Sequence, residues 1–187
     1  MNKMVIVVAP SGAGKSTFID EVLKKPSLGL KDTITFTTRS MRPGESEGEP
    51  YHFISGEEFE KKIESGFFVE WAKVHSSYYG TSLEQIREYW AQGFSVIMDV
   101  DIQGAETFKK KFPEALIVFI EPPDLEVLKE RLLIRGGGKL PSDFEVRMES
   151  AQKELKWSKN ADEIIVNDDF DRAFSEFLNK VESYLNS

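Results

Sequence analysis

The hydrophobic residues of this chain fall into short apolar runs separated by longer stretches with helical spacing. The first run, Met4-Val5-Ile6-Val7-Val8, is continuous and mostly β-branched, which is typical of a strand buried on both faces of a parallel sheet. Further apolar runs lie at 94–100, 115–120 and 164–166, and a stretch with helical spacing follows each of them. This alternation predicts an α/β fold, with a parallel-sheet core and helices on both faces.

Helices are predicted where apolar positions recur every three or four residues. Ser82 and Ser142 precede two of these stretches as caps, and the second has Glu145 at the capping-box position. The predicted helices of the core span 17–25, 83–92, 102–111, 124–135, 142–157 and 170–184. The last one repeats large apolar side chains that we expect to pack in the core, namely Phe170, Phe174, Phe177, Leu178, Val181 and Leu185.

Residues 33–81 interrupt this alternation. Their pattern predicts strands at 33–38, 51–54 and 67–74 and one short helix at 57–64, capped by Ser55. We therefore expect a small β-rich subdomain inserted into the core. The predicted parts are a core of residues 1–32 and 82–187, with a helical lid at about 124–157, and an inserted subdomain of residues 33–81.

A glycine-rich loop, APSGAGKST, joins the first strand to the first helix. Such a loop turns backbone N–H groups toward an anionic phosphate, and the helix N-terminus adds its positive dipole end. Lys15 is predicted to reach the β- and γ-phosphates of a nucleotide, and Ser16 to ligate Mg²⁺. Ala9 stands where the general pattern has its first glycine, which is sterically possible while φ stays negative. The residues predicted to bind the nucleotide are Pro10, Ser11, Gly12, Ala13, Gly14, Lys15, Ser16 and Thr17.

Composition narrows the class of function. The net charge of -8 argues against nucleic acid or an anionic membrane as partner. The chain has no cysteine, and His52 and His75 are isolated, so neither a disulfide framework nor a zinc site is expected. No apolar run approaches the ~18 residues of a membrane span, and we expect a cytoplasmic protein. The oligomeric state is left open.

Two aspartates stand at the carboxyl end of the predicted strand at 94–100, where open α/β sheets bind ligands. Asp99 is a candidate for the Mg²⁺ shell beside Ser16. Asp101 is a candidate for a ligand contact, and the alternative is that it only caps the next helix.

Three arginines surround the glycine run 136–138. Arg131 and Arg135 lie four apart before it, and Arg147 lies after it. Phosphoryl transfer spreads negative charge over the moving group, and arginines on a closing flap would neutralise that charge. The alternative is a solvated helix face; the phosphate-binding loop favours the catalytic interpretation.

The inserted segment carries its own candidate residues. Arg39, Arg42, Tyr51 and Tyr79 offer guanidinium and phenol donors for a second phosphate. Glu70 stands between apolar neighbours, and its carboxylate can accept from both N1–H and N2–H₂ of guanine, two donors that adenine lacks on that edge. Simple surface alternation of the strand is the other explanation for Glu70.

The chain resembles guanylate kinases over essentially its whole length. The resemblance rests on seven stretches in the same order: APSGAGKST, TFTTRSMRPGE, GEPYHFIS, FFVEWAKVHSSYYGTS, MDVDIQG, IEPP followed by LKERLLIRG, and IIVNDD. It implies transfer of a phosphoryl group from ATP to GMP with Mg²⁺, giving ADP and GDP. An acceptor phosphate is already ionised at neutral pH, so no general base is expected.

The resemblance also assigns roles. It implies that Glu70, Thr35 and Thr81 recognise guanine, that Asp101 is a further GMP contact and that Asn167 lies on the adenine side. Arg39, Arg42, Tyr51 and Tyr79 are implied to hold the GMP phosphate, and Arg131, Arg135 and Arg147 to be the lid arginines. Thr35 stands where the family commonly has Ser, which keeps the hydroxyl group and adds a methyl group.

Two other functions remain compatible with this pattern. One is a guanylate-kinase-like module that binds phosphopeptides without turnover; the intact loop with Gly12, Gly14, Lys15 and Ser16 argues against it. The other is a kinase for a different small phosphorylated acceptor, against which Glu70 and the two hydroxyl positions speak.

Overall fold

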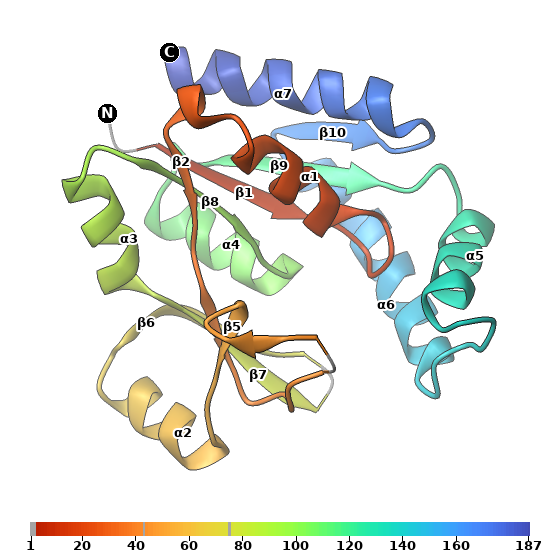
Figure 1. Cartoon of the computed structure of the whole chain (residues 1–187), viewed down its shortest axis with the longest axis horizontal. Helices are drawn as coiled ribbons and strands as arrows, with labels where there is room; N and C mark the ends of the chain where they lie inside the picture. The colour runs from red at the N-terminus through yellow and green to blue at the C-terminus, as the bar shows by residue number, and fades with distance from the viewer. Residues whose placement is uncertain (1–2, 43, 75) are drawn as a thin grey trace.

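The computed structural model describes residues 3–42, 44–74 and 76–187, and His75 lies outside them. Two sheets organise this part of the chain (Figure 1). The larger sheet has the strand order β10-β9-β1-β8-β2, and all its neighbouring pairs are parallel. Its strands are β1 (Met4–Val8), β2 (Leu30–Asp32), β8 (Ser95–Asp99), β9 (Leu116–Glu121) and β10 (Glu163–Val166).

Helices cover both faces of this sheet. On one face α1 (Lys15–Leu23) and α7 (Phe170–Asn186) bury their apolar sides, and the ring of Phe18 packs edge-on to Phe170 and Phe177 at centroid distances of 5.3 and 5.4 Å. On the other face α3 (Leu83–Ala91) and α4 (Ile102–Lys111) pack against Met4, Ile6 and Val8. The continuous apolar run of β1 is therefore explained by burial on both sides.

A second sheet lies below the first in Figure 1, with the strand order β4-β5-β3-β7-β6. The aromatic ring of Phe59, on the short helix α2 (Gly56–Glu64), stacks on Phe68 and Tyr78 at 4.5 and 5.3 Å and forms a small core of its own. The strands are β3 (Thr35–Thr37), β4 (Ser46–Glu47), β5 (Pro50–Phe53), β6 (Phe68–Val74) and β7 (Ser77–Ser82).

Two helices, α5 (Leu125–Arg135) and α6 (Phe144–Trp157), stand beside the carboxyl end of the large sheet, at the right of Figure 1. They follow β9 and precede β10, and the glycine run joins them. Within the described residues, no helix is both long and apolar enough to cross a membrane.

The predicted α/β class with a parallel sheet is confirmed, and each apolar run of the core is a strand. Other predictions were wrong. The strands β2, β4 and β7 were not predicted, and the helix expected at 17–25 spans 15–23. Two further boundaries differ for reasons that the structure shows. The strand expected at 33–38 spans only 35–37, because residues 30–32 pair with β8 and the chain then crosses to the second sheet. The helix expected to open at Ser142 begins at Phe144, because the N–H of Phe144 donates to the carbonyl of Pro141 and closes a turn there.

Candidate active site

A cavity of about 1150 Å³ lies between the phosphate loop, α5, α6 and the second sheet. The predicted site residues all line it, with three exceptions. Ala13 is a fully buried residue of the loop itself, and Thr81 is fully buried behind Glu70. The side chain of Arg135 lies outside what the structure describes, so its predicted role stays untested.

The phosphate loop has the backbone that its glycines allow. Gly12 and Gly14 have φ values of 94° and 105°, in the left-handed region that favours glycine. A Cβ added to Gly14 would lie 2.8 Å from Nδ2 of Asn167, so this position also needs glycine for space. Gly14 is the N-cap of α1, and the free N–H groups of the first helical turn therefore face the cavity.

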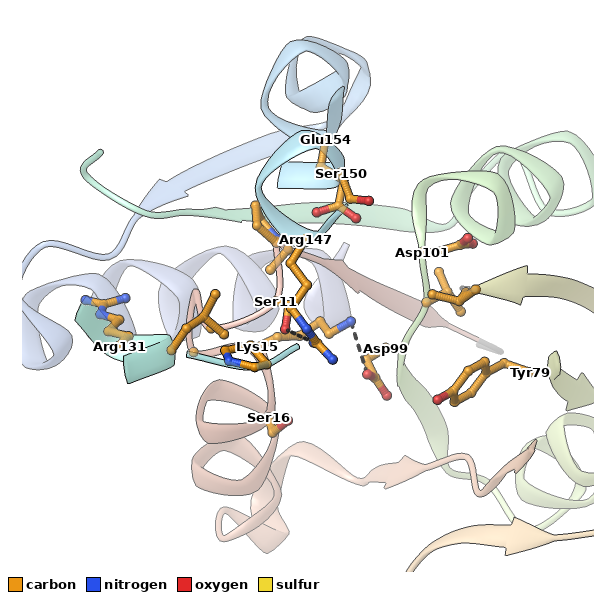
Figure 2. Close-up of a pocket in the computed structure, with 18 of the residues that line it drawn as sticks. Ser11, Lys15, Ser16, Tyr79, Asp99, Asp101, Arg131, Arg147, Ser150 and Glu154 are labelled. Atoms are coloured by element: carbon orange, nitrogen blue, oxygen red, sulfur yellow. Dashed lines mark hydrogen bonds and ion pairs between the residues drawn. The ribbon is translucent and has the colours of Figure 1, made fainter. Parts of the chain in front are cut away.

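Strand pairing brings Asp99 beside the loop. Val7 of β1 is in register with Asp99 of the parallel neighbour β8, so both strands deliver their ends to one edge of the sheet. Nζ of Lys15 lies 3.1 Å from Oδ2 of Asp99 (Figure 2). Ser16 lines the same cavity, as expected for the first helical turn after the loop.

Two side chains brace the loop from behind. The guanidinium group of Arg131, on α5, donates to the carbonyls of Ala13 at 3.2 Å and Asn167 at 2.9 Å. Nδ2 of Asn167, just after β10, donates to the same Ala13 carbonyl at 2.8 Å. These bonds tie the loop to α5 and to the end of the large sheet.

Arg147 reaches the loop from α6. Its guanidinium group donates to Oδ1 of Asp143 at 2.8 Å and to the hydroxyl of Ser11 at 3.1 Å. In Figure 2 the side chain points from the helix down to the loop, between the phosphate loop and Asp99. A cation therefore stands over the place where a bound phosphate would lie.

Glu70 is a buried carboxylate on the opposite side of the cavity, with 7% of its surface exposed. Its Oε1 accepts from the hydroxyl of Thr81 at 2.8 Å, since β6 and β7 are antiparallel and pair Glu70 with Thr81. Burial raises the pKa of the Glu70 carboxyl to about 7, and the Thr81 hydrogen bond opposes this shift. Thr35, also buried, lines the same part of the cavity.

The predicted phosphate clamp is formed by the second sheet and its loop. Arg39 pairs with Glu45 through two hydrogen bonds of 3.0 and 2.8 Å, and its guanidinium lies 5.3 Å from the ring centre of Tyr51. The rings of Tyr51 and Tyr79 are 5.8 Å apart. Burial raises the pKa of Tyr51, so its hydroxyl remains a hydrogen-bond donor at neutral pH.

Among the polar residues that line the cavity, sequence reasoning missed Glu45, Lys139, Ser150 and Glu154. Burial raises the pKa of the Glu154 carboxyl to about 7, while Lys15 lowers it and Asp101 raises it further. Ser150 and Glu154 follow Arg147 by three and seven residues, so one face of α6 carries all three. That spacing was the available signal.

Asp101 both lines the cavity and caps α4, accepting from the N–H of Gly104 at 2.8 Å.

The guanylate kinase family model matches residues 1–186. This chain belongs to the guanylate kinase family. The guanylate kinase of Bdellovibrio bacteriovorus is 51% identical over 183 residues, which are 98% of each chain. That of Idiomarina loihiensis is 43% identical over 178 residues, 94% of this chain and 83% of the relative.

A solved structure agrees on the fold. The crystal structure of guanylate kinase from Anaplasma phagocytophilum has a TM-score of 0.82 and 24% identity, and the match covers 100% of this chain and 87% of that chain. Guanylate kinases are ATP:GMP phosphotransferases, so the family confirms the resemblance and the predicted class of enzyme, a kinase that transfers the γ-phosphoryl group of ATP to GMP.

Proposed function

We propose that this family's reaction takes place in the described cavity, with ATP on the phosphate loop and GMP against the second sheet. The observation that carries the proposal is that one cavity is lined both by the phosphate loop and by Glu70, Arg39 and Tyr79. The two phosphates would thus meet between Lys15 and Arg147. In this proposal residues 33–81 act as the GMP-binding subdomain and about 124–157 as the lid.

The phosphate loop would hold the triphosphate through its N–H groups and Lys15. Arg131 supports the loop from below, and Arg147 stands over it, so the transferring group would lie between cations on both sides. We retain the proposal that Asn167 lies on the adenine side; its bond to Ala13 adds a part in shaping the loop. Arg135 stays a candidate for a third lid arginine.

The residues present fit Mg²⁺. The Ser16 hydroxyl and the Asp99 carboxylate line one cavity, and oxygen donors of this kind are what Mg²⁺ prefers. Among the described residues no three His, Cys, Asp or Glu side chains gather into a metal site, so phosphate and water oxygens would complete the shell. When bound with ATP, the ion would neutralise charge on the β- and γ-phosphate oxygens.

GMP would lie with its base at Glu70 and its phosphate at the clamp. The carboxylate of Glu70 accepts from guanine N1–H and N2–H₂, Thr81 holds that carboxylate, and Thr35 and Asp101 are further contacts. Arg39, Arg42, Tyr51 and Tyr79 supply donors to the phosphate. The acceptor oxygen is already ionised at neutral pH, so these residues position and neutralise charge, and none must remove a proton.

A coupled assay of ADP release with each of the four ribonucleoside monophosphates tests the proposal. We expect turnover with GMP well above that with AMP, CMP or UMP. Lys15→Met should remove most turnover, because Lys15 is the lysine of the phosphate loop itself, and should leave the fold intact. Unchanged GDP production by a well-folded Lys15→Met variant contradicts the proposal, as does faster turnover with another monophosphate.

ATP and GMP are the partners that this function requires. We also propose that the protein acts in the cytoplasm, because nucleoside monophosphates and ATP are both available there.

A further inference from the structure

Glu70 lies on a strand that its own sheet holds on one side only. β6 is the last strand of the order β4-β5-β3-β7-β6, and its register with β7 shifts between Phe68 and Glu70. Three successive side chains, Phe68, Val69 and Glu70, are buried, although alternate residues of a regular strand face opposite sides. Pairing with β7 therefore does not by itself determine where the carboxylate lies.

The other neighbour of β6 is α4, which belongs to the core. Val69 packs in the same apolar cluster as Ala105 and Phe108 of this helix. We propose that α4 positions Glu70 for guanine, with Gly104 making room for its carboxylate and Lys111 holding its backbone. This inference rests on the proposed function of Glu70 and adds two positioning residues to it.

Gly104 is needed for the close approach of the carboxylate. A Cβ added there would lie 3.0 Å from Oε2 of Glu70, 3.0 Å from Cβ of Val100 and 3.3 Å from Oδ1 of Asp101. The residue is in the first turn of α4, where glycine is less favourable than alanine by about 1 kcal/mol. Helix geometry thus gives no reason for glycine, whereas the space beside Glu70 does. The positive end of the helix dipole also favours an ionised carboxylate at this position.

Lys111 acts from the other end of α4. Its ammonium group donates to the carbonyl of Val69, the residue just before Glu70. The same positive charge lowers the pKa of the Glu70 carboxyl, against the effects of burial and of Asp101. The groups facing Glu70 are thus Thr81 from β7, and Asp101, Gly104 and Lys111 from α4 and its cap.

These contacts have a consequence for specificity. Guanine offers two donors to Glu70, so the carboxyl group must be ionised and both of its oxygens must be correctly placed. If α4 places these oxygens, substitution of Gly104 or Lys111 should weaken GMP binding, although neither residue lines the cavity. Binding of ATP, which is held by the loop, should not change.

Steady-state kinetics of Lys111→Met tests this inference. We expect KM for GMP to rise about five- to thirtyfold, with kcat and KM for ATP within about twofold of wild type. Lys111→Arg keeps the charge and a donor, and should restore most of the GMP affinity. Lys110→Met is the matched control, because it removes one positive charge from the same helix end and should behave as wild type.

Gly104→Ala is the second arm. It should raise KM for GMP about tenfold or more, with kcat and KM for ATP within about twofold of wild type. Gly56→Ala is its control, since Gly56 is also in the first turn of a helix and an added Cβ there meets nothing within 4 Å. If Gly104→Ala fails to fold, the Lys111 variants decide.

The outcomes separate this inference from the proposed function. If the wild-type protein phosphorylates GMP, and Lys111→Met has the same KM for GMP as Lys110→Met, the positioning role is overturned and the proposed function stands. A parallel loss of kcat and of both affinities also overturns it, because that is the result of general damage. A wild-type protein that does not phosphorylate GMP overturns both.

Discussion

At the scale of single residues, the chemistry of Glu70 depends on two acceptors in one side chain. Replacing it with Gln keeps the size but turns one acceptor into an NH₂ donor, so one guanine donor loses its partner. This should cost about 2 to 4 kcal/mol, or about thirty- to a thousandfold in kcat/KM for GMP. The measurement is kcat/KM for GMP and AMP in wild type and Glu70→Gln.

AMP provides the internal control for this variant. A Gln amide can donate to adenine N1 and accept from its N6 amino group, so discrimination between GMP and AMP should shrink even if AMP stays a poor substrate. A GMP value within about twofold of wild type, with an unchanged ratio, would identify Glu70 as a strand residue without a part in recognition.

The sequence was informative about residues whose type is unusual for their surroundings. Glu70 stood out because its neighbours are apolar, and Lys15 because of the loop around it. Glu154 did not stand out, because a glutamate on a helix usually faces solvent, and only the packing of α6 over the cavity buries it. The Thr81–Glu70 hydrogen bond depends on the register of two strands, which their composition does not reveal.

At the scale of elements, the apolar runs of the large sheet were sufficient to predict its strands, since burial on both faces leaves a continuous signal. The passage from β2 to β3 could not be predicted in the same way. Here the chain leaves one sheet for the other at residues 33–34 without glycine or proline, and the N–H of Ile34 is held by Oε1 of Gln85 on α3. A tertiary contact therefore sets this boundary.

The two helices of the proposed lid, α5 and α6, should respond differently to loss of Arg131 and Arg147. Arg131→Met removes the donor to two carbonyls that connect α5, the loop and the end of β10, so it should lower both turnover and the free energy of unfolding, the latter by about 1 to 2 kcal/mol. Within the described part of the chain, Arg147→Met removes hydrogen bonds to Asp143 and to the Ser11 hydroxyl. It should lower turnover by about a hundredfold with little change in stability.

Chemical denaturation combined with kcat measures both effects. The comparison requires the ligand-free protein for stability and saturating ATP and GMP for turnover. Equal losses of stability in the two variants would show that α5 is not the helix that supports the loop.

At the scale of the whole molecule, one buried and two half-buried carboxyl groups give stability an unusual dependence on pH. Burial raises the pKa of Asp32 to about 8 and those of Glu70 and Glu154 to about 7. The folded state then keeps protons that the unfolded state has already lost near pH 4 to 5. The free energy of unfolding of the ligand-free protein should therefore fall by several kcal/mol as pH rises from 5 to 8.

Asp32→Val supplies the control for this prediction. Oδ1 of Asp32 is buried and has no hydrogen-bond partner among the described residues. Its removal should therefore raise stability at pH 8 more than at pH 5 and flatten the dependence on pH. Some carboxyl groups, such as Glu45 and Glu58, have lowered pKa values. They gain and lose their protons at more acidic pH, so they do not oppose this trend. Stability that increases between pH 5 and 8 in wild type would contradict the assignment.

The contact between Lys15 and Asp99 implies an order of assembly. While the two side chains neutralise one another, a lone divalent cation gains little at Asp99 and a lone triphosphate must first draw Lys15 away. A metal–nucleotide complex would satisfy both side chains at once, because its metal ion pairs with Asp99 while its phosphates pair with Lys15. By thermodynamic reciprocity, metal and nucleotide would then raise each other's affinity to the same extent, and in the proposed function the complex, more than either component, would be the species that the loop selects.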